Sequence, residues 1–208
     1  MDSASLEQLL QKSPALLWQG RKASTQKQGI ASGFPALDRL LPSAGWPLAC
    51  ITEISTMQCG AGELRLLMPA IAKLTQQALY VVWIAPPFIP YAPSLSAYGI
   101  DLRYLIILDS IDNEQDQYWS MEKLLPCKQC GMVLMWPHSY HDKHIRLLQL
   151  AAEKGNSLAI LYPRNRQQHS SASLRLLIQA TAINQLQITI LKARGVLHAR
   201  TTTLSVQL

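Results

Sequence analysis

Apolar residues along this chain fall into short runs with two different spacings. Runs of strand length, rich in apolar and β-branched residues, occupy 50–54, 78–84, 105–108, 132–136 and 157–162. Between them, apolar residues recur every three or four positions, as in amphipathic helices, over 63–77, 91–99, 115–125 and 144–154. Largely apolar strands that alternate with helices predict an α/β fold: a mostly parallel sheet with helices on both faces.

The two ends of the chain depart from this alternation. Only seven residues separate the apolar runs 174–178 and 186–191, too few for a crossover helix, so an antiparallel pair is expected at the C-terminal edge. At the other end, leucines at helical spacing are interrupted by Pro14, and a polar linker follows over 20–29. The chain is therefore divided into an N-terminal helical segment and linker, 1–29, and a core domain, 30–208.

The composition is that of a globular protein. Hydrophobic residues make up 49% and charged residues 15% of the 208 residues, and no apolar run approaches the roughly 18 residues of a membrane helix. The N-terminus lacks the charged and apolar regions of a secretory signal, and the four cysteines form no disulfide framework. A cytoplasmic protein that does not contact a membrane is expected.

Charge is distributed unevenly between the two parts of the chain. Residues 1–142 contain ten basic and twelve acidic residues, whereas residues 143–208 contain nine basic residues and one acidic residue, Glu153. A basic C-terminal third indicates an anionic partner, most commonly nucleic acid. A solvated basic surface without a partner is the alternative.

The turn after the 50–54 strand has the context of a phosphate-binding loop. The positions that such a loop would use are Thr56, Gln58, Gly60, Gly62, Glu63 and Leu64. A working loop places Lys and then Ser or Thr after its last glycine, to contact phosphate and magnesium. Here Glu63 repels phosphate and Leu64 cannot ligate a metal. The pattern favours a plain helix entry, with Glu63 at the positive end of the helix.

Two further groups of residues have the spacing of metal or redox sites. Cys127 and Cys130 are three positions apart, but no second pair with that spacing exists. His138, His141 and His144 recur every three residues without a set of carboxylates beside them. A polar turn is the better interpretation of the histidines, and no cofactor or metal is expected.

Several longer motifs along the chain resemble those of a known family. The segment Gly-Phe-Pro-Ala-Leu-Asp at 33–38 resembles the entry to the RecA core. Further motifs are Trp-Gln-Gly-Arg at 18–21, Gly-Trp-Pro-Leu at 45–48, Gly-Ala-Gly-Glu-Leu-Arg-Leu-Leu at 60–67, Ala-Pro-Pro-Phe-Ile-Pro-Tyr-Ala-Pro at 85–93, Gly-Ile-Asp-Leu at 99–102 and the helix segment 147–155. Together these resemble the motifs of ImuA, a RecA-like family of the bacterial DNA-damage response. The resemblance covers roughly residues 16–195 and implies a RecA-like fold for the core.

The same resemblance implies that catalysis has been lost. Pro87 stands where RecA proteins place the glutamate that activates water, and Trp136 stands where they place the aspartate that organises magnesium. Without lysine, metal ligand and base, phosphoryl transfer has no mechanism. The loops that contact single-stranded DNA in RecA proteins match 137–143 and 163–171, so the residues expected to bind DNA or a partner are Arg164, Arg166, His169, Lys192 and Arg194.

Three classes of function remain open, and the first two follow from the resemblance. The first is a non-catalytic accessory protein of error-prone translesion synthesis in the SOS response. Its implied partners are an inactive Y-family polymerase homologue and an error-prone replicative-type polymerase, with RecA and single-stranded DNA as further partners. The second is a SulA-like inhibitor of cell division that binds FtsZ. The third is a residual nucleotide-binding ATPase.

Overall fold

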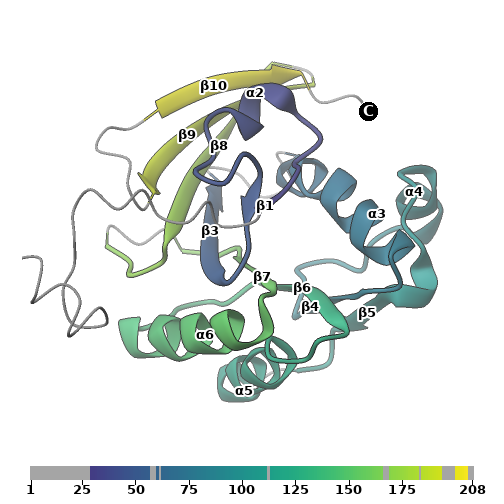
Figure 1. The fold of residues 1–208 in the computed structure, drawn as a ribbon, viewed down its shortest axis with the longest axis vertical. Coiled ribbons are helices and arrows are strands. Elements are labelled where there is room, and N and C mark those ends of the chain that lie inside the picture. The colour runs from purple at the N-terminus through teal and green to yellow at the C-terminus, as the bar shows by residue number, and fades with distance from the viewer. Residues whose placement is uncertain are drawn as a thin grey trace, which may run out of the picture.

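The computed structural model describes residues 29–56, 60, 62–111, 113–165, 169–182, 184–193 and 200–205. The main sheet contains eight strands, whose bounds are β3 (Cys50–Thr56), β4 (Tyr80–Ile84), β5 (Leu105–Leu108), β6 (Cys130–Met135), β7 (Leu158–Leu161), β8 (Leu174–Ala182), β9 (Gln185–Ala193) and β10 (Arg200–Ser205). Their order across the sheet is β10-β9-β8-β3-β7-β6-β4-β5 (Figure 1). The six strands from β8 to β5 are parallel, and β9 and β10 continue the sheet in antiparallel fashion.

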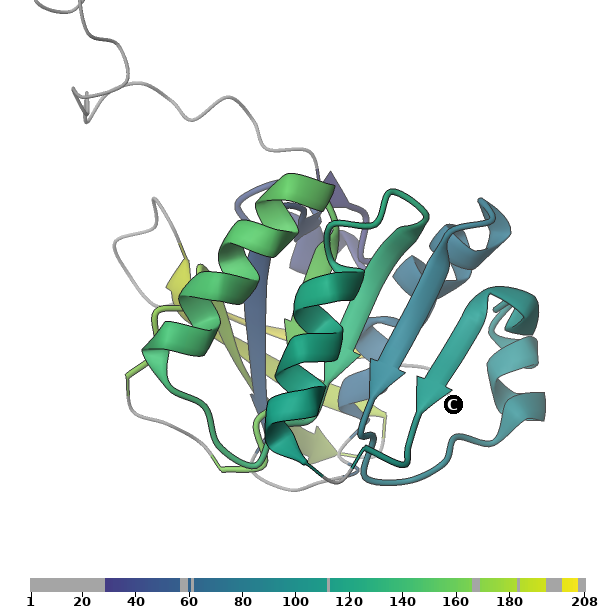
Figure 2. The ribbon, with the colours of Figure 1, turned by 90° about the horizontal axis from the view of Figure 1, so that it is seen from below.

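Helices cover both faces of the parallel part, as the sequence predicts. On one face lie α3 (Met68–Gln76) and α4 (Ala92–Ala97); on the other lie α5 (Glu114–Leu124) and α6 (Asp142–Gly155) (Figures 1 and 2). Successive residues of the central strands therefore enter two separate cores, with Trp83 packed toward α3 and Val82 toward α5 and α6. Because both faces are covered, these strands are apolar throughout, which explains their uninterrupted sequence pattern.

Local sequence sets where α6 ends. Asn156 adopts a left-handed conformation with φ of 53°, which an asparagine tolerates well and which stops the helix. At Gly155 a Cβ atom would collide with the carbonyl oxygen of Leu125, so α6 and the end of α5 approach as closely as they do only because this residue is glycine. Ser157 then donates a hydrogen bond of 2.8 Å to the same carbonyl and fixes the start of β7.

The predicted helix over 63–77 was wrong in one respect. It is two helices: a 3-10 helix, η1 (Glu63–Leu66), and then α3, with Leu67 between them. Pro69 in the first turn of α3 explains the break, since proline has no N–H to continue the hydrogen bonding of η1 and is favoured at a helix start. The other predicted helices and strands are confirmed to within a few residues at each end.

The predicted antiparallel pair at the C-terminal end is confirmed as β8 and β9, but it does not form the edge. The edge strand is β10, which was not predicted because its residues are mostly polar. A small sheet of β1 (Gly29–Ile30) and β2 (Trp46–Pro47), the short α2 (Pro35–Asp38) and the 3-10 helix η2 (Leu102–Tyr104) were also missed. The expected N-terminal helix lies outside the described residues. Within the described residues, every helix is too short or too polar to cross a bilayer.

Candidate functional site

Ligands of parallel α/β sheets bind where the strands end, so a site is expected at the carboxyl edge of β3, β4, β6 and β7. Thr56 ends β3 half-buried, and Gly60 and Gly62 both have left-handed backbones, with φ of 80° and 89°. Gly62 leads directly into η1. The strand, glycine turn and helix predicted from sequence are therefore present, although Gln58 lies outside the described residues.

The two residues after Gly62 are both withdrawn from solvent. Glu63 is 8% exposed, and its Oε2 is buried with no hydrogen-bond partner among the described residues. Leu64 is half-buried and packs against the apolar core on the α3 side of the sheet. A carboxylate in this position disfavours a phosphate beside it, because like charges repel.

Large aromatic side chains fill the carboxyl edge on the same side of the sheet as α3. Trp83 lies in β4, Trp136 directly follows β6, and Tyr162 directly follows β7; we call these three the aromatic row. The rings of Trp136 and Tyr162 stack at 5.3 Å between centroids, and those of Trp83 and Trp136 are tilted at 5.7 Å. All three are at most 5% exposed. Each aromatic pair stabilises the fold by about 0.5–1.5 kcal/mol beyond its buried area.

The aromatic row joins the glycine turn directly. The hydroxyl of Tyr162 donates a hydrogen bond of 3.4 Å to the backbone oxygen of Glu63. Burial, and then the nearby charge of Glu63, raise the pKa of Tyr162 well above its usual value, so the phenol keeps its proton. Trp136 is therefore part of a packed apolar core.

Next to this edge, the proline-rich stretch after β4 forms an exposed apolar loop. Pro87 is half-buried, whereas Phe88, Ile89 and Tyr91 are 76%, 75% and 74% exposed. We call these three exposed residues the apolar loop. The prolines around them restrict the backbone. The loop therefore loses little backbone conformational entropy when a partner binds these three side chains.

The segments 137–143 and 163–171, which we call the basic loops, and the neighbouring strand β9 contain some of the predicted contact residues. Arg164 and His169 are exposed, and Lys192 on β9 is exposed and donates a hydrogen bond of 3.0 Å to Ser170 O. Arg166 and Arg194 lie outside the described residues. The loop after β7 is also tied to α6, because Asp142 accepts hydrogen bonds of 3.0 and 2.8 Å from Ser171.

These contacts place one acidic group within the basic loops. Hydrogen bonds from Ser171, and then the charges of Arg146 and Lys192, hold the pKa of Asp142 below its usual value. Asp142 is therefore ionised at neutral pH and offsets part of the positive charge around it. Nine basic residues follow position 142. One of them, Arg175, adds no charge to the protein surface, because it is only 6% exposed.

Arg175 instead belongs to a buried polar cluster that the sequence analysis missed. Its Nε and Nη2 donate hydrogen bonds of 3.1 and 2.9 Å to Oε1 of Glu53, which is fully buried in β3. Oε2 of Glu53 accepts a hydrogen bond from the hydroxyl of Tyr140. Burial, and then the bond to Glu53, raise the pKa of Tyr140. The cluster ties β3, β8 and the loop after β6 together and leaves the buried carboxylate compensated.

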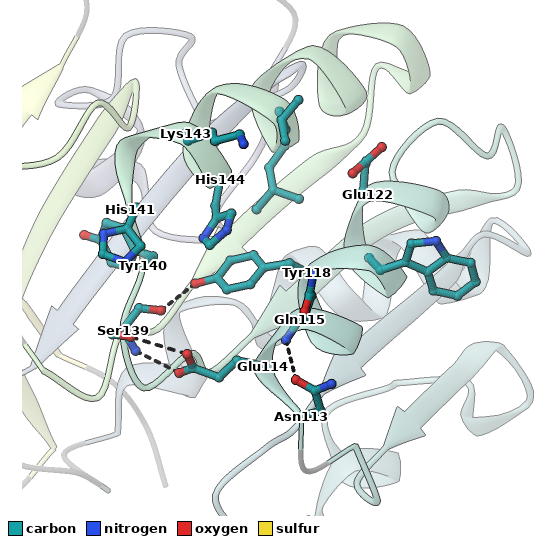
Figure 3. Close-up of a pocket in the computed structure, with 13 residues that line it drawn as sticks. Asn113, Glu114, Gln115, Tyr118, Glu122, Ser139, Tyr140, His141, Lys143 and His144 are labelled. Atoms are coloured by element: carbon teal, nitrogen blue, oxygen red, sulfur yellow. Dashed lines mark hydrogen bonds between the residues drawn. The ribbon is translucent and has the colours of Figure 1, made fainter.

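A pocket of about 600 Å³ lies between α5 and α6 (Figure 3). Among its lining residues, Glu114 accepts hydrogen bonds of 3.1 and 3.3 Å from Ser139, and Tyr118 donates one of 2.6 Å to Ser139 O. The ring of His144 stacks on Tyr118 at 4.2 Å. Burial, and then the charges of His141 and Lys143, lower the pKa of His144, so it is neutral at pH 7.

Neither group with metal or redox spacing forms a metal site in the described part of the chain. Three or more histidine, cysteine or acidic side chains that could share an ion do not come together there. Cys127 is an exposed free thiol and Cys130 a buried one. Burial raises the pKa of Cys130 to about 12, so it is not a thiolate at neutral pH.

The fold and its carboxyl edge define the class of protein to which the chain can be assigned. It is an α/β protein with a mostly parallel, eight-stranded mixed sheet and an antiparallel edge. No protein-family model matches the chain, and no curated protein matches it.

Proposed function

We propose that this chain is a non-catalytic, RecA-like accessory protein of the SOS response that binds polymerase partners in error-prone translesion synthesis. The fold supports the RecA-like assignment in its coarse features. These are a mostly parallel sheet, helices on both faces, an antiparallel C-terminal edge, and a glycine turn after β3, the first strand of the main sheet. The resemblance of motifs 18–21, 45–48, 60–67, 85–93 and 99–102 to the ImuA family supplies the finer assignment.

The observation that carries a binding role is the apolar loop. Phe88, Ile89 and Tyr91 are each about three quarters exposed, and they lie within the ImuA-like motif at 85–93. Exposed apolar side chains on a backbone stiffened by proline are typical of a protein-binding surface, because burying them costs little ordering entropy. The aromatic row supports the non-catalytic part of the proposal, since it fills the strand ends where nucleotide chemistry would need polar groups.

The apolar loop is tested by substituting two of its residues together. In a pull-down from DNA-damaged cells of the protein's own source, Phe88→Ser with Tyr91→Ser lowers the recovery of polymerase components at least about tenfold, as expected when interface hot spots are removed. Leu102→Ser, a change at an exposed apolar residue on η2 outside both surfaces, is the control and leaves recovery unchanged. Recovery of FtsZ in place of polymerases contradicts the proposal and favours the SulA-like function. ATP turnover that Gly62→Ala abolishes favours the residual ATPase.

The basic loops supply the DNA part of the proposal. Arg164→Glu with Lys192→Glu weakens the binding of single-stranded DNA whatever the DNA sequence. The slope of log K against log salt concentration becomes shallower by about 1 for each phosphate that is no longer neutralised. The measurement is a salt titration of fluorescence anisotropy with a labelled oligonucleotide. The control is Lys73→Glu, an exposed lysine on α3, across the sheet from α5 and α6. A double variant with the slope of the wild-type protein removes DNA from the proposal.

A further inference from the structure

The surface formed by α5 and α6 leaves large apolar side chains uncovered. Trp119 on α5 is 59% exposed, and Leu147 and Leu150 on α6 are 43% and 64% exposed. Trp119 and Leu147 line the pocket of about 600 Å³ between the two helices. Leu150 lies one turn further along α6, next to Leu147 on the helix surface. We call the pocket with these three residues the α5–α6 groove; its volume holds several side chains of a partner segment.

An apolar segment of suitable length precedes the described part of the chain. Leu6, Leu9 and Leu10 fall at the i, i+3, i+4 spacing of one helix face, and Leu16 and Leu17 follow Pro14. A helix with such a face is stable only when the face is buried against another surface. The segment therefore needs an apolar surface of about its own length.

The chain enters the fold next to α6. Gly29 pairs with Pro47 in the small sheet, and two residues later Ala49 donates a hydrogen bond of 3.0 Å to Ser157 O, just beyond the end of α6. The side chain of Gln149 in α6 donates a hydrogen bond of 3.1 Å to Ala49 O. The ten residues 20–29 span up to about 33 Å, and the 14-residue α6 is about 21 Å long, so residues 5–18 reach any part of the groove.

The tether also favours this segment as the occupant. A linker of this length holds the segment at an effective concentration of about 1 mM. A contact with an intrinsic Kd of only about 0.1 mM is then about 90% occupied within each molecule.

We propose that residues 5–18 dock in the α5–α6 groove of their own chain, with Leu6, Leu9 and Leu10 against Trp119, Leu147 and Leu150. The docked segment covers a second apolar surface, separate from the apolar loop. A partner that binds the groove must first displace it. This inference does not depend on the proposed function, since it concerns a contact within one molecule.

Disulfide trapping tests the contact directly in the full chain. In a background with Cys59→Ser and Cys127→Ser, the pair Leu10→Cys and Leu147→Cys is oxidised with glutathione disulfide. We expect an intramolecular bond at a rate about tenfold above that of the control pair Leu10→Cys and Lys73→Cys, whose second residue lies on α3 across the sheet. Equal rates for both pairs overturn the proposal, because they indicate an undirected tether. Bonds only between molecules overturn it in favour of a second copy.

Hydroxyl-radical footprinting gives an independent readout. In the full chain carrying Leu6→Asp, Leu9→Asp and Leu10→Asp, the modification of Trp119 and Leu147 rises about fivefold, as expected when a mostly closed groove opens. Phe88 and Tyr91, exposed elsewhere, are the internal standards and do not change. Equal modification of Trp119 in the wild-type protein and in the triple variant overturns the proposal. Protection that appears in the wild-type protein only at high concentration, or only with a partner present, also overturns self-docking.

Discussion

Trp136→Ala lowers the free energy of unfolding by about 3–5 kcal/mol in urea denaturation, the range for deleting a buried large aromatic side chain. Trp136 is 5% exposed and contacts the rings of both Trp83 and Tyr162. Its removal therefore takes away two aromatic contacts together with the area that the indole buries. The cavity lies where three strands end, and loops there collapse into it only in part.

Two further variants show whether the aromatic row is responsible. Trp136→Phe keeps an aromatic ring between the neighbours and costs about 1–2 kcal/mol, whereas Tyr91→Ala, at a residue 74% exposed, changes stability by less than about 0.5 kcal/mol. A Trp136→Ala protein as stable as the wild type would mean that the strand ends are open to solvent and able to accept a ligand.

Arg175→Met is expected to destabilise the fold by about 3–5 kcal/mol, because it leaves the carboxylate of Glu53 buried without a cation. Both side chains are almost fully buried, and the nearest charged nitrogen lies 2.9 Å from the carboxylate. The hydroxyl of Tyr140 still donates to Glu53 in the variant. A hydrogen bond from one phenol does not replace the charge interaction, so most of the destabilisation remains.

A double-mutant cycle separates the removal of the ion pair from the cost of a stranded charge. Glu53→Leu with Arg175→Met restores most of the stability, since a buried ion pair exchanged for apolar residues of similar volume is often neutral. The control is Arg103→Met, which breaks the exposed pair between Asp101 and Arg103, 2.7 Å apart, and has little effect. If the double variant is no more stable than Arg175→Met alone, the destabilisation comes from packing of the arginine.

Most of the parallel sheet was predictable because its signal is local. A strand such as β5, Leu105–Leu108, is an apolar run whatever its neighbours are, and the helices between the strands have their own periodicity. β10 was missed because an edge strand buries few residues: only Leu204 of its six residues is buried. The break between η1 and α3 had a visible cause in Pro69, but a single proline permits a helix start as readily as a kink.

The candidate site was predictable only where its residues are consecutive. The glycine turn and the exposed basic residues Arg164 and Lys192 were found in the sequence. The pair of Glu53 and Arg175 joins positions 122 apart, and no local pattern shows that they meet. The aromatic row had a signal, because Trp83 lies near the end of one predicted strand while Trp136 and Tyr162 end two others. That signal becomes meaningful only when the order of the strands across the sheet is known.

The position of β3 in the sheet has a consequence for how the chain acquires its structure during synthesis. β3 is made first among the parallel strands, yet its two neighbours are β7 and β8, whose paired residues begin at Leu158 and Leu174. More than a hundred residues must leave the ribosome before either edge of β3 is covered. Contacts this distant along the sequence form slowly, and unpaired strand edges invite aggregation. The nascent chain thus leaves both edges of β3 unpaired until the segment that begins at Leu158 has emerged.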